Sequence, residues 1–143
     1  NFIFRNGSTF NSAVKVNTGT LTAYNDQSPY IGIYYGTITV DAGAVFSTPA
    51  GGYTAQVKNS VTNNGTITTG GGAGFSMKGP SFINNSSVTC QNLSFDSTTT
   101  ISGSGTYTGS TISIGSTGNV SLGNNITISL SSGFTVTNGG ILN

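Results

Sequence analysis

Short apolar runs recur along this chain of 143 residues at a nearly constant spacing, and the spacing is what most constrains the fold. Each run places two or three apolar residues at alternate positions and ends at Gly, Asn or Ser. A run matches the third run after it: Leu93 precedes Ile112 by 19 residues, and Ile67 precedes Val88 by 21. Three short strands per turn of about 20 residues is the geometry of a solenoid, in which successive coils stack in parallel over a shared core.

The same rule predicts stacked pairs along the whole chain. These are Val14 with Ile33, Leu21 with Val40, Val40 with Val61, Phe46 with Ile67, Phe75 with Phe95, Phe82 with Ile101, Ile101 with Val120, Tyr107 with Ile126 and Val120 with Ile141. The sequence therefore predicts an all-β fold, a parallel β-helix or β-solenoid, formed by residues 1–143 as a single domain. We expect about seven coils of roughly 19–21 residues, with three short strands in each.

A four-residue motif, Gly-Thr-x-Thr with Leu, Ile or Tyr at x, begins at Gly19, Gly36, Gly65 and Gly105. The Gly lets the backbone turn, and the next three residues alternate Thr outward, apolar inward and Thr outward. The stretch 47–55 differs, because Pro49 and two Gly residues disfavour a central strand. We expect a protruding loop there.

Composition narrows the list of partners and compartments. Only 5% of the residues are charged and the net charge is +1, so the clustered cations that bind nucleic acid are missing. No apolar run approaches the length of a membrane span, and we expect no membrane insertion. A neutral chain rich in Thr, Ser, Asn and Gly, with one Cys, is typical of a secreted or cell-surface protein.

The sequence offers little for catalysis. His and Glu are absent, which removes the usual general bases and the strong transition-metal ligands. The remaining carboxylates, Asp26, Asp41 and Asp96, are widely spaced and fit turn positions. Cys90 alternates with Val88 on an inward face and is expected to be a buried hydrophobe. We expect no enzyme, no catalytic or metal-ligating residues and no cofactor.

Two surface features are candidates for binding. Tyr30, Tyr34, Tyr35 and Tyr53 lie near the expected loop, where their rings can stack on glycans, or can instead be partly buried beneath it. Outward Thr and Ser rows can order water on a stiff sheet, as ice-binding solenoids do, or can simply reflect the preference of Thr for exposed strands. The sequence leaves both pairs of alternatives open.

Asn63-Asn64-Gly65-Thr66-Ile67-Thr68 and Gly118-Asn119-Val120-Ser121-Leu122 carry the repeat in its clearest form. In composition and rhythm the chain resembles the parallel β-helix repeats of bacterial surface proteins, such as adhesin passenger domains and extracellular fibres. The resemblance implies an exported, stiff scaffold used for adhesion or as a fibre. It brings no binding residue with it.

Neither end of the chain carries a polar cap, so both are expected to expose core and unpaired backbone. The expected assembly residues are Phe2, Ile3 and Phe4 at one end and Ile141 and Leu142 at the other. We therefore expect a structural subunit of an extracellular filament or surface fibre, whose partners are copies of itself or further repeats of the same chain. The alternative is an adhesin segment that binds glycans through its Tyr-rich face.

Overall fold

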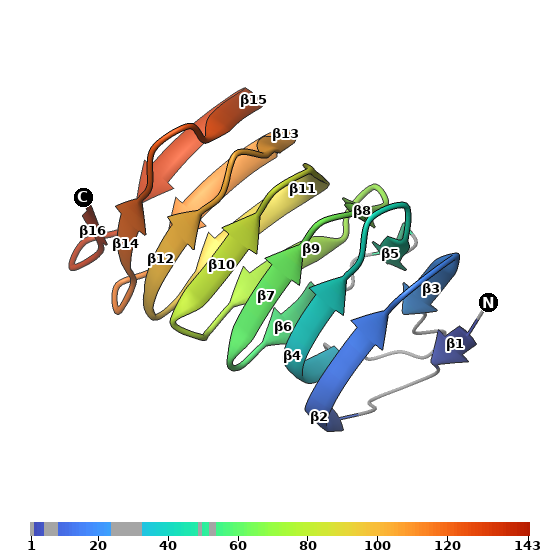
Figure 1. Ribbon diagram of the computed structural model, residues 1–143. Helices are drawn as coiled ribbons and strands as arrows, with labels where there is room; N and C mark the ends of the chain where they lie inside the picture. The colour runs from blue at the N-terminus through green and yellow to red at the C-terminus, as the bar shows by residue number, and fades with distance from the viewer. Residues whose placement is uncertain (1, 5–8, 24–32, 49, 52–53) are drawn as a thin grey trace.

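The chain folds as an all-β parallel solenoid of about six turns, close to the number expected. The computed structural model describes residues 2–4, 9–23, 33–48, 50–51 and 54–143, which form sixteen strands and no helix. Every strand pair in this part of the chain is parallel, and the coils stack so that the N- and C-terminal ends lie at opposite ends of the solenoid (Figure 1).

The strands fall on three faces. Face 1 contains β1 (Phe2–Phe4), β3 (Thr20–Ala23), β5 (Val45–Thr48), β8 (Thr66–Thr69) and the first halves of β11 (Ser87–Phe95), β13 (Thr106–Ile114) and β15 (Thr127–Val136). Face 2 contains the second halves of β2 (Thr9–Val16) and β4 (Ile33–Val40), followed by β7 (Ser60–Asn63), β10 (Ser81–Asn84), β12 (Thr98–Ser102), β14 (Asn119–Leu122) and β16 (Ile141–Leu142). Face 3 contains the first halves of β2 and β4, then β6 (Thr54–Val57), β9 (Gly74–Met77) and the second halves of β11, β13 and β15.

Four of the predicted stacked pairs are confirmed as register partners. They are Phe46 with Ile67, Ile67 with Val88, Phe82 with Ile101, and Leu93 with Ile112. They lie in the middle of the chain, where the corners between strands keep the same length from coil to coil. The period of 19–21 residues holds in this region because adding no residue at a corner leaves the alternation in phase.

The other predicted pairs are wrong in register. Leu21 pairs with Phe46 and Val14 with Ile38, so this coil is longer than the 19 residues expected. The remaining predictions miss by one or two positions, since the observed partners are Val40 with Asn63, Phe75 with Leu93, Ile101 with Leu122, Tyr107 with Ile128 and Val120 with Leu142. A slip of two keeps a residue on its face, so the inward side was predicted correctly even where the partner was not.

Alternation along each strand builds the core. Most four-residue strands alternate half-buried and buried residues, as the Gly-Thr-x-Thr motif predicts for β3 and β8. At the centre Phe75 and Phe82 are fully buried and stack with their ring centroids 5.7 Å apart. Phe82 also contacts Tyr107, at 5.4 Å between centroids, and Phe95, at 6.5 Å. This aromatic cluster ties all three faces together.

One buried corner is polar. The side-chain amides of Asn63 and Asn84 are fully buried and stacked, with Asn63 Nδ2 donating to Asn84 Oδ1 at 2.8 Å. Each amide also bonds the backbone of its own turn and of the next coil: Asn63 Nδ2 donates to the Ser87 carbonyl, and Asn84 Nδ2 to the Thr106 carbonyl. The amides thus satisfy backbone groups that the corner would otherwise leave unpaired.

Gly65, in the motif that follows this corner, is needed for space. A Cβ at this position would lie against the carbonyl oxygens of Ala44 and Asp41 and 3.0 Å from Val40 Cγ1. Because two of these contacts are backbone atoms, the strand must shift to make room. We expect Gly65→Ala to lower the free energy of unfolding by about 3 kcal/mol, measured by urea denaturation.

Gly71 is the matched control for Gly65. It is exposed, and a Cβ there would meet no atom within 4 Å. Gly71→Ala should leave the stability unchanged or raise it by up to about 1 kcal/mol, because Ala restricts the unfolded chain. Equal effects of the two substitutions would contradict the close packing at Gly65.

The range expected to form a loop, 47–55, includes strand residues at both ends. β5 continues to Thr48 and β6 begins at Thr54. Between them, Ala50 and Gly51 are exposed, and the Gly51 amide donates to the Gly71 carbonyl of the next coil at 3.1 Å. Residues 49, 52 and 53 lie outside the described part of the chain.

Candidate assembly surface

The last turn exposes apolar side chains that earlier turns bury. Among the described residues the exposed large hydrophobics are Leu122, Phe134, Val136, Ile141 and Leu142, between 38% and 49% exposed. All five continue inward columns of the core: Phe134 stacks on Ile112, Val136 on Ile114 and Leu142 on Val120. They are exposed because no described coil lies beyond them. The strands β15 and β16 each pair with one described neighbour and leave one edge open.

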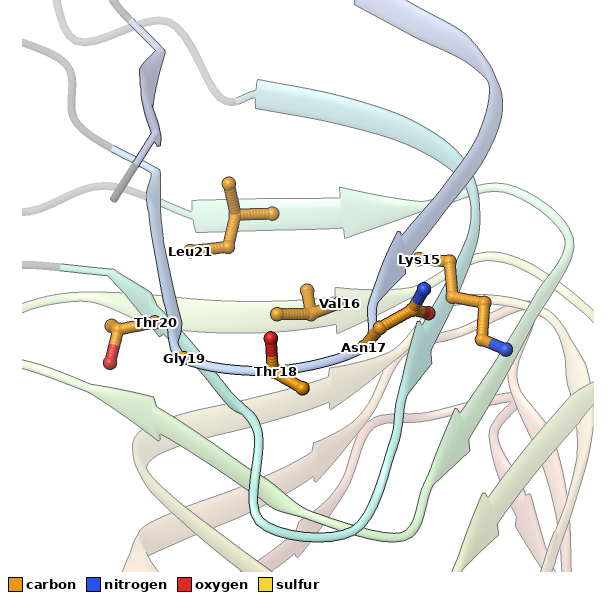
Figure 2. A pocket seen from close by; sticks show the side chains of 7 residues that line it. All are labelled: Lys15, Val16, Asn17, Thr18, Gly19, Thr20 and Leu21. Atoms are coloured by element: carbon orange, nitrogen blue, oxygen red, sulfur yellow. The ribbon is translucent and has the colours of Figure 1, made fainter.

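The other end carries a hollow. It has a volume of about 280 Å³ and is lined by the bend between β2 and β3, residues 15–21. In Figure 2 the side chains of Val16 and Leu21 turn to the inside of this bend, and Lys15 lies at its rim. Lys15 Nζ is 3.1 Å from Asp41 Oδ2, an exposed ion pair that holds its cation on face 2. Two ends of different shape therefore face opposite directions along the stack.

The predicted assembly residues lie at these two ends. Ile141 and Leu142 form β16 and are 49% and 41% exposed. Phe2, Ile3 and Phe4 form β1, the first strand of face 1, whose partners on β3 are Leu21, Thr22 and Ala23. Sequence reasoning missed Leu122, Phe134 and Val136. Their signal was present, because these apolar runs of the last coil have no run 19–21 residues after them.

The Tyr-rich face that was predicted to bind glycans is not assembled by the described residues. Tyr35 was wrong as a contact residue: its ring is 0% exposed and packs edge-on against Phe46 with centroids 5.5 Å apart. Burial raises the pKa of the Tyr35 phenol well above its usual value. Tyr30 and Tyr53 lie outside the described residues, and of Tyr34 only the backbone, in β4, is described.

Titratable groups do not gather into a site in the part of the chain that the structure describes. Asp96 Oδ2 accepts a hydrogen bond from Ser76 Oγ at 3.2 Å, while Asp41 sits in a turn at another corner. No group of three potential metal ligands occurs among these residues. Cys90 is buried as predicted, and burial raises the pKa of its thiol to about 12, which suppresses the reactive thiolate. Nor does the described chain contain any helix with the length and apolar character to cross a bilayer.

Comparisons with known proteins add no further constraint. No protein-family model matches the chain, and no curated protein or solved structure matches it.

Proposed function

We propose that this chain is a structural subunit of an extracellular filament or surface fibre, in which copies of the chain join end to end. The observation that carries the proposal is the confinement of exposed large hydrophobics to the last turn. Elsewhere among the described residues the same columns are closed by a further coil. The occupant that fits such a surface best is another coil of the same kind, because it continues both the backbone ladder and the apolar columns.

Strand direction supports a head-to-tail contact between copies. All described strand pairs are parallel, so the open edges of β15 and β16 run in the same direction as β1 and β2 at the other end. A second copy can therefore extend the stack without reversing the chain. Contacts of this heterologous type do not close on themselves and generate filaments.

A rough energy decides what the contact needs. Five side chains about half exposed yield about 4 kcal/mol when their remaining surface is buried. Association costs about 4–15 kcal/mol, so apolar burial alone is insufficient. The backbone hydrogen bonds along the ten-residue edge of β15 must contribute as well. We therefore expect assembly to depend steeply on protein concentration.

The test is negative-stain electron microscopy together with light scattering over a concentration series. Wild-type chain should form fibres, and Phe134→Lys should abolish them because it places a charge on the end surface. Thr135→Lys is the control: Thr135 is the next residue on β15, is also exposed and points away from the core. It should assemble like wild type, and circular dichroism should show that both variants fold.

Mixing separates end-to-end growth from other modes of association. A Phe134→Lys subunit keeps its N-terminal end intact, so it should add to a wild-type fibre and stop further growth there. Fibre length should fall as the fraction of Phe134→Lys rises. A wild-type chain that stays monomeric at every concentration, or fibres that tolerate Phe134→Lys, would overturn the proposal.

A further inference from the structure

Face 1 presents two unbroken ranks of outward residues across six successive coils. The first rank is Thr20, Val45, Thr66, Ser87, Thr106 and Thr127, joined by strand register. The second rank is Thr22, Ser47, Thr68, Thr89, Thr108 and Ser129, joined in the same way. Every position except Val45 carries a hydroxyl. We name these twelve positions the hydroxyl face.

The other two faces lack this regularity. On face 2, one rank reads Lys15, Thr39, Thr62, Ile83 and Ser102, so a cation and an apolar residue interrupt it. On face 3, Gly74, Asn92 and Gly133 break one rank, and the register shifts between Gly109 and Thr111. A general preference of Thr for exposed strands would enrich all three faces alike. The concentration of hydroxyls on one face therefore indicates a use for that face.

The hydroxyls of this face are not consumed within the protein. Among the described residues, none of the eleven takes part in a side-chain hydrogen bond. Hydroxyls on the other faces do: Thr111 Oγ1 donates to Asn92 Oδ1 at 2.6 Å, and Ser76 Oγ donates to Asp96. The hydroxyl face thus keeps its donors and acceptors for groups outside the chain.

The hydroxyl face is also a regular lattice. Neighbouring strands lie about 4.8 Å apart, and alternate residues along a strand are about 6.7 Å apart. Eight of the twelve positions are Thr, whose branched Cβ restricts rotation about χ1 and holds the hydroxyl and methyl groups in place. The strands beneath are fixed by a core that includes the fully buried Phe46, Ile67 and Val88. None of the twelve residues is charged or aromatic.

We propose that the hydroxyl face binds ice. Ice is a neutral solid that presents hydrogen-bond donors and acceptors at fixed intervals, and a fixed array of hydroxyls can match it without losing side-chain entropy on binding. The methyl groups of Thr fill the space between hydroxyls, so little disordered water has to stay trapped. A crystalline polysaccharide fits less well, because proteins bind sugar rings by stacking aromatic side chains and this face has none. The proposal concerns single subunits and does not depend on filament formation.

The test compares one substitution on two faces. Thr89, in the second rank of the hydroxyl face, and Thr100, on face 2, are both exposed strand residues. Wild type and Thr100→Lys should concentrate in slowly grown ice and separate the freezing and melting points in a nanolitre osmometer. Thr89→Lys should lower the enrichment in ice by about tenfold, because its ammonium must be dehydrated against the crystal. Circular dichroism confirms that each variant is folded.

Each other outcome would overturn the proposal. Wild-type chain that is excluded from ice as a non-binding protein is would remove it directly. Equal effects of Thr89→Lys and Thr100→Lys would show that the hydroxyl face has no special role. Retention on microcrystalline cellulose or chitin that Thr89→Lys abolishes, without any effect on freezing, would reassign the face to a polysaccharide.

Discussion

Replacing Phe82 with Ala is expected to lower the free energy of unfolding by about 3–5 kcal/mol, the largest effect of any single substitution considered for this chain. Phe82 is fully buried and contacts three other rings: Phe75, Phe95 and Tyr107. These rings come from β9, β11 and β13, so the contacts join all three faces. Truncation at this position leaves a cavity that a stack of short, hydrogen-bonded strands cannot collapse to fill.

Urea denaturation of Phe82→Ala and of Ile83→Ala provides the comparison. Ile83 is the next residue on β10 and points outward, where it is half-buried, so its truncation should cost less than about 1.5 kcal/mol. Unchanged m-values would show that the midpoints report stability and not a change in the unfolded chain. A loss at Phe82 no larger than the loss at Ile83 would contradict the aromatic cluster as the centre of the core.

The second large effect is expected from Asn84→Ala, which should cost about 2–4 kcal/mol. The substitution removes the acceptor of Asn63 Nδ2 at 2.8 Å and of the Ser86 amide at 3.2 Å. It also removes the donor to the Thr106 carbonyl. Several buried or half-buried polar groups then lose a partner at a corner that water reaches poorly, and an unpaired buried group is costly.

Asn85 gives the matched control for Asn84. Its Nδ2 donates to Asn64 Oδ1 at 2.8 Å, the same distance as in the buried pair, but both side chains are exposed. Water can replace this bond, so Asn85→Ala should change the free energy of unfolding by less than about 0.5 kcal/mol. Thermal or urea denaturation of the two variants side by side measures the difference. Similar losses would mean that the stacked amides contribute no more when buried than when exposed.

The sequence predicted the inward and outward sides well and the register less well. Alternation is a local property, so the burial of Phe75, Phe82 and Cys90 followed from their neighbours alone. Register depends on how many residues each corner inserts, and the long coil that pairs Leu21 with Phe46 spans residues 24–32. A constant period cannot reveal such an insertion, because the apolar pattern resumes in phase after it.

The assembly surface was half predicted for the same reason. Ile141 and Leu142 were found because they close the chain, whereas Phe134 and Val136 resemble the core runs before them. Their exposure, 38% and 43%, follows from the absence of a described coil stacked upon them, which is a tertiary property. Tyr35 shows the opposite error, since proximity to an expected loop said nothing about which side of β4 the ring would occupy.

By itself, the sequence determined a β-solenoid of short strands with small and hydroxyl residues outward, because strand alternation and Gly-rich corners are local constraints. Only the tertiary structure decided what those residues meet across the coils. The dipeptides Asn63-Asn64 and Asn84-Asn85 have the same composition, yet Asn63 and Asn84 are buried while Asn64 and Asn85 are exposed. Likewise, the Thr residues form unbroken ranks on one face alone. Both outcomes depend on how coils superpose, and superposition is set by corner lengths and side-chain packing summed over the whole stack.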